Sequence, residues 1–183
     1  LFFDIDSIFT LQERKELIFS RYCHYRITTS PFGKDWKDKC RFTTYYVSSG
    51  SSSNIYYPTG EEKQYDIIFI GDKNPESETF YHFLKGQKYK TEFFGNGFNK
   101  IEIKDAKHIM SKSKLILNLK DPDEFGQSNE NFWSFMASGT MILSKNINNM
   151  EDRFEMKEGV HISTFGNLMD FKRKLNQYLN SAK

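Results

Sequence analysis

The spacing of hydrophobic and polar positions changes near residue 65 of the chain. From there on, short apolar runs alternate with stretches whose apolar residues recur at helical spacing. The first run ends at Gly71 and is almost entirely apolar, as is typical of a strand buried on both faces of a parallel sheet. The pattern predicts strands over residues 66–70, 90–94, 115–119, 140–144 and 160–164, and helices over 75–85, 105–113, 132–138 and 167–179. We therefore expect an α/β domain with an open parallel Rossmann-like sheet and helices on both faces.

The first 60 residues are polar and aromatic, with little regular alternation. The elements predicted there are strands over 25–30 and 42–47 and a helix over 31–39. The serine-rich stretch Ser48–Ser53 is predicted to be a linker, and we place the domain boundary near Gly60. We expect residues 1–60 to be the end of a preceding α/β domain with its linker, and residues 61–183 to be the Rossmann-like domain. Because the chain begins with Leu1 inside an apolar stretch, we expect it to be a piece of a longer protein.

The amino-acid composition bears on the kinds of partner and the compartment to be expected for the protein. The 183 residues include 26 Lys and Arg against 24 Asp and Glu, a balance too even to favour a nucleic acid as partner. Two cysteines without metal-ligand spacing indicate a reducing compartment, so we expect a cytoplasmic protein. No apolar run is long enough to span a bilayer, and we expect no transmembrane segment.

Ligands of open α/β sheets bind outside the carboxyl ends of the strands, and the loops predicted there contain residues suited to phosphate. Glycines allow close approach of the backbone to a ligand, and lysines supply positive charge. The candidate phosphate-binding residues are Gly71, Lys73, Gly95, Gly97 and Lys120. A helix that begins near Asn129 would direct free N–H groups to the same edge. A diphosphate is the expected ligand, and the alternative is that these glycines only end strands.

The connection over residues 121–131 is unusually polar and precedes an apolar helix. Carboxylates and amides of this kind hydrogen-bond vicinal hydroxyl groups, which predicts a sugar or ribose site. The candidate residues are Glu124, Gly126, Gln127, Ser128, Asn129 and Glu130. The alternative is a solvated loop with a turn at Asp121-Pro122 and a helix cap at Ser128.

Several segments, taken in order, resemble the C-terminal half of GT-B glycosyltransferases of group 1, and in particular the CgeB-like proteins. They are Thr29–Trp36, Tyr57-Pro58, Tyr65–Gly71, Phe94–Gly97, Ser113–Asn118 and Met136–Thr140. The resemblance covers most of residues 23–180. It implies that residues 61–183 bind a nucleotide-sugar donor, and that the end of an acceptor-side domain precedes them.

The resemblance also implies an activity. A sugar would pass from a nucleoside-diphosphate sugar to a hydroxyl group of a glycan or glycoconjugate, without a metal or other cofactor. The catalytic base would come from the N-terminal domain, so no catalytic residue is assigned in this chain, and the oligomeric state stays open.

The chain departs from the family pattern in the helix before Gly139. The glutamate that binds the donor ribose in the family corresponds to Ser134, and the family arginine corresponds to Asn131. A neutral hydroxyl group binds ribose less strongly than a carboxylate does. Glu130 lies one helical turn earlier and is the candidate replacement. The alternative is a non-catalytic binding or scaffolding domain derived from a glycosyltransferase.

Overall fold

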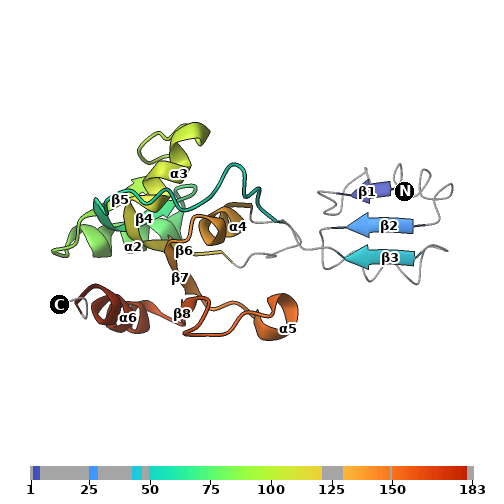
Figure 1. The fold of residues 1–183 in the computed structure, drawn as a ribbon. Helices are drawn as coiled ribbons and strands as arrows, with labels where there is room; N and C mark the ends of the chain where they lie inside the picture. Colours follow the sequence, from blue (N-terminus) through green and yellow to red (C-terminus); the bar gives the residue numbers. More distant parts are fainter. Residues whose placement is uncertain are drawn as a thin grey trace. The chain divides into compact units, whose positions relative to one another are not determined.

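The computed structural model describes residues 2–4, 25–28, 43–46, 50–120, 130–148 and 150–180, which belong to two compact units (Figure 1). The first unit comprises residues 1–50 and 122–130, and the second comprises 51–121 and 131–183. In the first unit, strands β1 (Phe2–Asp4), β2 (Tyr25–Thr28) and β3 (Thr43–Tyr46) form a parallel sheet in that order. The strands predicted over 25–30 and 42–47 are thus confirmed, β1 was not predicted, and the helix predicted over 31–39 lies outside the described residues. The division near Gly60 stays a prediction.

The second unit contains one parallel sheet and the helices that connect its strands. Its elements are β4 (Tyr65–Ile70), α2 (Pro75–Lys85), β5 (Thr91–Phe94), α3 (Ile103–Ser111), β6 (Ser113–Asn118), α4 (Glu130–Ala137), β7 (Met141–Lys145), α5 (Met150–Phe154), β8 (Ser163–Phe165) and α6 (Leu168–Asn180). The strand order is β5-β4-β6-β7-β8, with every neighbouring pair parallel. This order makes the unit an open, doubly wound α/β fold, which confirms the predicted fold class.

Helices cover both faces of this sheet (Figure 1). Successive residues of a strand point to opposite faces, and in β4 apolar side chains on each face pack against helices. Ile67 and Phe69 of β4 pack in a core with residues of α2 and α6. Ile68 packs in a second core with residues of α3 and α4. Both faces of the central strands are therefore buried, which explains why those strands are apolar almost throughout.

The predicted bounds of α2 are confirmed because local signals mark both of its ends. Asn74 and Ser77 form a capping box, in which the Asn74 side chain accepts the N–H of Ser77 at 2.9 Å. Pro75 occupies the first helical position, and Gly86 follows the last. Local sequence signals thus mark both ends of this helix.

The end of the sheet departs from prediction. The last strand was expected over residues 160–164, but β8 spans Ser163–Phe165. Val160 instead lies in a turn with 71% of its surface exposed, and the Gly159 N–H donates to the carbonyl oxygen of Ile162 at 2.8 Å. The five-residue helix α5 was not predicted. The alternation of Val160, the polar His161 and the buried Ile162 resembles the start of a strand, but Val160 and His161 are both exposed.

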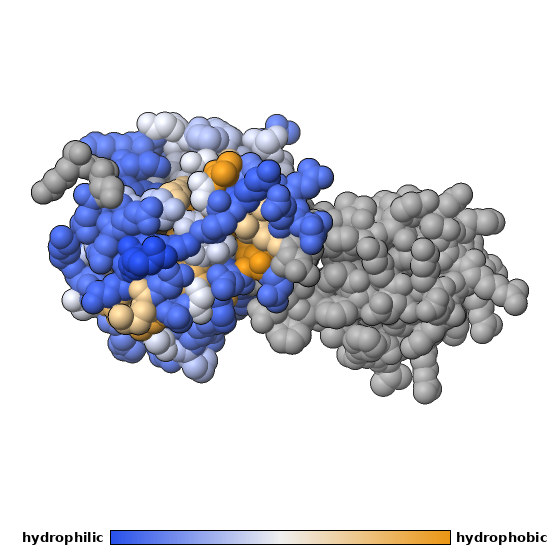
Figure 2. Space-filling view, turned by 90° about the horizontal axis from the view of Figure 1, so that it is seen from below, coloured by the Kyte–Doolittle hydropathy of each residue, from blue (hydrophilic) through white to orange (hydrophobic). Residues whose placement is uncertain are grey.

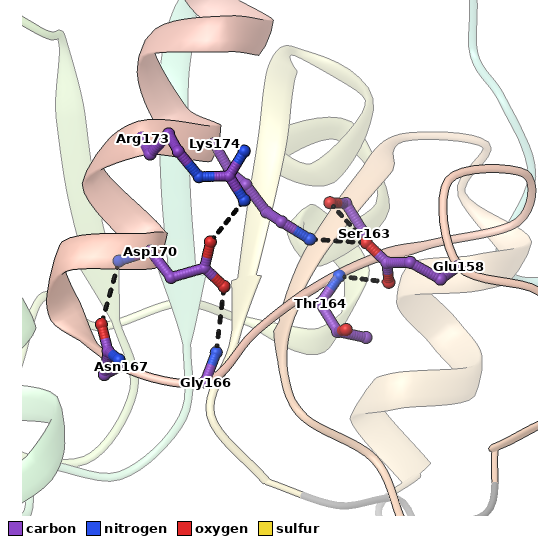
Figure 3. Close-up of polar contacts among 8 residues, drawn as sticks. All are labelled: Glu158, Ser163, Thr164, Gly166, Asn167, Asp170, Arg173 and Lys174. Atoms are coloured by element: carbon purple, nitrogen blue, oxygen red, sulfur yellow. Dashed lines mark hydrogen bonds and ion pairs between the residues drawn. The ribbon is translucent and has the colours of Figure 1, made fainter.

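Figure 3 shows how polar side chains surround β8 and the start of α6. Glu158 Oε2 accepts the backbone N–H of Thr164 at 2.7 Å, while its Oε1 accepts from Lys174 Nζ at 2.6 Å. Partial burial by itself would raise the pKa of Glu158, but the hydrogen bonds from Lys174 and Thr164 outweigh it and lower this pKa. The carboxylate therefore bridges strand β8 and helix α6 in its ionised form.

Residues 51–64, which we call the strap, contain no helix or strand and form hydrogen bonds with α3, α4 and the start of β6. Lys63 Nζ donates to the carbonyl oxygens of Ser111 and Ser113, both at 2.8 Å. Glu61 accepts from Thr59 Oγ1 at 2.6 Å and His108 Nδ1 at 2.8 Å. The hydrogen bond from Thr59, followed by that from His108, lowers the pKa of Glu61 from 4.5 to about 2. The strap is thus held to α3 and β6 by charged and polar side chains.

Candidate functional site

The loops that follow β4 and β5 lie against each other at the carboxyl edge of the sheet. The Gly71 N–H donates to the Phe94 carbonyl oxygen at 2.9 Å, and the Lys73 N–H donates to that of Asn96 at 2.8 Å. Gly95 has a φ of +125° and Gly97 a φ of +82°. The structure thus brings together four of the predicted site residues, Gly71, Lys73, Gly95 and Gly97.

Packing between these loops explains the glycines without a ligand. A Cβ atom on Gly95 would lie 2.2 Å from the Gly71 carbonyl oxygen, and one on Gly97 would lie 2.6 Å from Lys73 Cβ. A Cβ atom on Gly71 would lie 2.9 Å from the Phe69 ring. The alternative interpretation, in which the glycines end strands and allow the loops to pack, is sufficient at these positions.

The acidic first turn of α2 pairs with lysines of the same edge. Lys73 Nζ lies 2.9 Å from Glu78 Oε1, and Lys145 Nζ, at the end of β7, lies 2.8 Å from Glu76 Oε1. Lys120 follows β6, is exposed, and has no carboxylate within ion-pair distance among the described residues. Of the two predicted phosphate-binding lysines, Lys73 thus forms an ion pair with Glu78, whereas Lys120 forms no ion pair with a described residue.

A buried polar pair that the sequence analysis missed lies where β6 and β7 end. Asn118 Nδ2 donates to Ser144 Oγ at 2.9 Å and to the Lys120 carbonyl oxygen at 2.6 Å. Ser144 Oγ donates in turn to the Lys145 carbonyl oxygen at 2.8 Å. The two side chains thus hold the backbone at the carboxyl ends of β6 and β7, where the loops begin. The available signal was one polar residue at the same place in two apolar runs, LILN and MILS.

The predicted ribose site is only partly described. Ser134 lies on α4 with 6% of its surface exposed, and its hydroxyl oxygen is 3.2 Å from that of Ser51 in the strap. Asn131 is exposed, and Glu130 is the first residue of α4. The candidates Glu124, Gly126, Gln127, Ser128 and Asn129 lie outside the described residues. The role of all of these residues in ribose binding stays a prediction.

Two further observations concern metals and membranes. Within the described ranges, no group of three or more His, Cys, Asp or Glu side chains is arranged to hold a metal ion. None of the helices described between residues 75 and 180 is both long and apolar enough to cross a membrane.

Comparison with known proteins adds structural relatives. Neither a protein-family model nor a curated protein sequence matches the chain. The solved structure of TarM matches with a TM-score of 0.59 and 14% identity, over 94% of this chain and 40% of that one. A mutant of S. aureus TarM in complex with fondaparinux, α-GlcNAc-glycerol and UDP has a TM-score of 0.59, with 13% identity over 94% of this chain and 40% of that chain. The pneumococcal O-GlcNAc transferase GtfA, in complex with UDP and GlcNAc, matches with a TM-score of 0.50 and 10% identity, over 97% and 41%.

At these identities the likeness establishes the fold. The second unit has the open parallel Rossmann-like fold that also occurs in the GT-B glycosyltransferases TarM and GtfA. This chain spans about 40% of the length of the TarM chain. The finer resemblance to CgeB-like proteins stays a prediction.

Proposed function

We propose that the chain is the donor-binding part of a GT-B-type glycosyltransferase. Its second unit would bind a nucleoside-diphosphate sugar at the carboxyl edge of the five-stranded sheet. The sugar would pass to a hydroxyl group of a glycan or glycoconjugate, in a metal-independent reaction of cytoplasmic polysaccharide synthesis. The activity of the whole enzyme, its acceptor and its location are all part of this proposal.

The observation that carries the proposal is the strand order at the centre of the sheet. The chain leaves β4 toward β5 on one side, and the later strands β6, β7 and β8 extend on the other. Ligands of doubly wound folds bind in the crevice where the strand order reverses. Here that point lies between the carboxyl ends of β4 and β6, which lead into Gly71 and Lys120. The UDP in the TarM and GtfA complexes supports the choice of ligand.

The described residues suit a diphosphate leaving group in one specific way. Negative charge develops on that group as the bond to the sugar breaks, and a fixed cation stabilises it. Lys120 supplies such a cation, and Asn118 holds the Lys120 backbone through its carbonyl oxygen. Asn118 is thereby a positioning residue for this loop.

Calorimetric titration of the 183-residue chain with UDP, GDP and UMP tests the proposal. We expect the diphosphates to bind more tightly than UMP, because the second phosphate adds charge at the edge. Lys120→Gln should weaken UDP binding about tenfold, as expected for loss of one charge-assisted contact. Lys88→Gln removes an exposed lysine from the connection between α2 and β5, at the opposite edge of the sheet, and is the matched control. Absence of binding by either diphosphate at millimolar concentration would contradict the proposal.

The second candidate is a non-catalytic binding or scaffolding domain that retains the fold. The specific observation in its favour is that Glu78 and Glu76 neutralise Lys73 and Lys145 at the edge where a diphosphate would bind. The same titration separates the candidates, since a scaffold that has lost the donor site binds none of the three nucleotides.

A further inference from the structure

A surface formed by the end of α2, the connection from α2 to β5 and residues 171–180 of helix α6 combines lysine with tyrosine, and the two stretches of chain that form it contain no acidic residue. The sequence contains no Asp or Glu over residues 79–91 or over residues 171–183. The first stretch contains Lys85, Lys88 and Lys90, and the second contains Lys172. This concentration of positive charge is hidden in the overall composition, where acidic residues elsewhere balance it.

The fold brings the two stretches together. Tyr89 lies in the connection from α2 to β5, and its hydroxyl group donates to Asn176 Oδ1 of α6 at 2.6 Å. Asn180 Nδ2 donates to the same hydroxyl oxygen at 3.2 Å. Lys172 precedes Asn176 by four positions, so it lies in the same row along the helix. We call the residues Lys85, Lys88, Tyr89, Lys90, Lys172, Asn176 and Asn180 the lysine–tyrosine surface.

Three lysines of this surface, Lys85, Lys88 and Lys90, lie over tyrosine rings. Lys88 Nζ lies 6.0 Å from the ring centre of Tyr89, and Lys90 Nζ lies 5.4 Å from that of Tyr65. Lys85 Nζ lies 5.6 Å from the ring centre of Tyr81. Among the described residues, the ammonium groups of these lysines and of Lys172 have no carboxylate within 4.0 Å, whereas those of Lys114 and Lys174 do. The nearest acidic neighbour of this surface is Asp66, whose Oδ2 accepts the Lys90 backbone N–H at 2.9 Å and whose Oδ1 pairs with Lys114. The charges of the lysines on this surface are therefore available to an external anion.

We infer that the lysine–tyrosine surface docks on an anionic phospholipid bilayer. Exposed lysines near a helix end attract anionic headgroups, and tyrosine favours the boundary between apolar and polar layers. A nucleic acid fits less well, because it requires open aromatic faces for its bases. On this surface Lys88 Nζ already lies over the Tyr89 ring, and the Tyr89 hydroxyl group donates to Asn176. On the face that Figure 2 shows, hydrophobic residues occur only in small separate areas among hydrophilic ones. The exposed large hydrophobic residues of the described chain are Ile55, Tyr57, Val160 and Met169, and none of them belongs to the lysine–tyrosine surface. The attraction is therefore electrostatic and reversible, and does not require insertion of a segment.

Vesicle sedimentation with the 183-residue chain tests the inference. The probes are phosphatidylcholine vesicles with and without about 30% phosphatidylserine, in about 0.1 M NaCl. We expect binding only to the anionic vesicles and its loss in about 1 M NaCl. The triple variant Lys85→Gln, Lys88→Gln, Lys90→Gln should bind about a hundredfold more weakly, at about fivefold for each lysine.

The matched control is the triple variant Lys100→Gln, Lys104→Gln, Lys157→Gln, which removes the same charge from exposed lysines elsewhere. Its vesicle binding should stay within about threefold of the unmodified chain, because interactions of surface charges fall off within a Debye length. Circular dichroism verifies that both variants are folded. Equal losses in the two variants would overturn the inference, as would no binding to anionic vesicles. Tighter binding to single-stranded oligothymidylate than to vesicles would overturn it in favour of a nucleic acid. Nucleotide titration is a separate measurement, so failure of the proposed function would leave this result unaffected.

Discussion

Gly95 approaches Gly71 so closely that a Cβ atom on Gly95 would lie 2.2 Å from the Gly71 carbonyl oxygen. The obstacle is backbone, which cannot move aside as the end of a side chain can. Gly95 also has a φ of +125°, a conformation that other residues rarely adopt. We predict that Gly95→Ala lowers the free energy of unfolding of the second unit by about 2–4 kcal/mol. Urea unfolding followed by circular dichroism measures the change.

Gly86→Ala is the control for this substitution, because Gly86 lies in the second unit with a φ of −80° and a Cβ atom built on it would meet no atom closer than 3.5 Å. We expect a change of no more than about 0.5 kcal/mol in the same assay. Equal effects of the two substitutions would mean that the approach of the two loops is not what requires glycine at position 95.

Neutralising Glu78 should strengthen nucleotide binding if the proposed site is correct. Glu78→Gln removes the carboxylate 2.9 Å from Lys73 Nζ and leaves that ammonium group available to a diphosphate. The pair is exposed, so we expect a gain of only about two- to fivefold in UDP affinity by calorimetric titration. Glu151→Gln removes a carboxylate of α5 that pairs with Lys157, and should not change the affinity. Weaker UDP binding by Glu78→Gln would contradict this prediction, because it would mean that Lys73 needs Glu78 in order to contribute to binding.

The residue after α5 is strained. Glu155 has a φ of +56°, and its N–H donates to the Glu151 carbonyl oxygen at 2.9 Å, as at a helix end where glycine is usual. Glu155→Gly should therefore stabilise the second unit by about 1 kcal/mol and raise its Tm by about 2–4 °C. Glu155→Ala keeps the Cβ atom and should give little or no gain. Calorimetry that shows equal Tm values for both variants would contradict this explanation.

Acid should release the strap from α3. The pKa of Glu61 is lowered to about 2, so the folded chain binds fewer protons there than the unfolded chain, whose carboxyl group titrates near 4.5. The stabilisation is fully present above about pH 5 and is lost as the pH falls from 4.5 toward 2. Glu61→Gln abolishes this titration. Urea unfolding between pH 7 and pH 2 should therefore show a stability difference between the two chains that disappears at the acid end.

Most of the second unit could be predicted because its elements depend on nearby residues. The apolar runs of β4 and β6 indicate burial on both faces, and Asn74, Pro75 and Gly86 mark the ends of α2. β8 was misplaced for a physical reason that the sequence does not express. The backbone N–H of Thr164 in β8 donates to the Glu158 carboxylate instead of to another strand. Glu158 lies just before residues 160–164, which were predicted to form the strand.

The site was harder to predict than the fold, because its electrostatics depend on pairs far apart in the chain. Lys145 and Glu76 meet only because β7 ends near the start of α2. Lys73 was expected to be a free cation, but its partner Glu78 lies one turn into the following helix. Ser134 was aligned with a ribose ligand by counting from Gly139, a procedure that gives no information on its contact with Ser51.

The Glu158 carboxylate has a consequence for the behaviour of the chain in crowded solution. An outermost strand normally presents backbone N–H groups to any extended chain nearby, and such contacts are the usual start of β-aggregation. On β8 the Thr164 N–H is already taken by Glu158, whose charge Lys174 holds in place. The ionised Glu158 side chain thereby hinders the pairing of another chain with β8, the last strand of the sheet. The protection depends on its charge, so the chain is most exposed to self-association in acid.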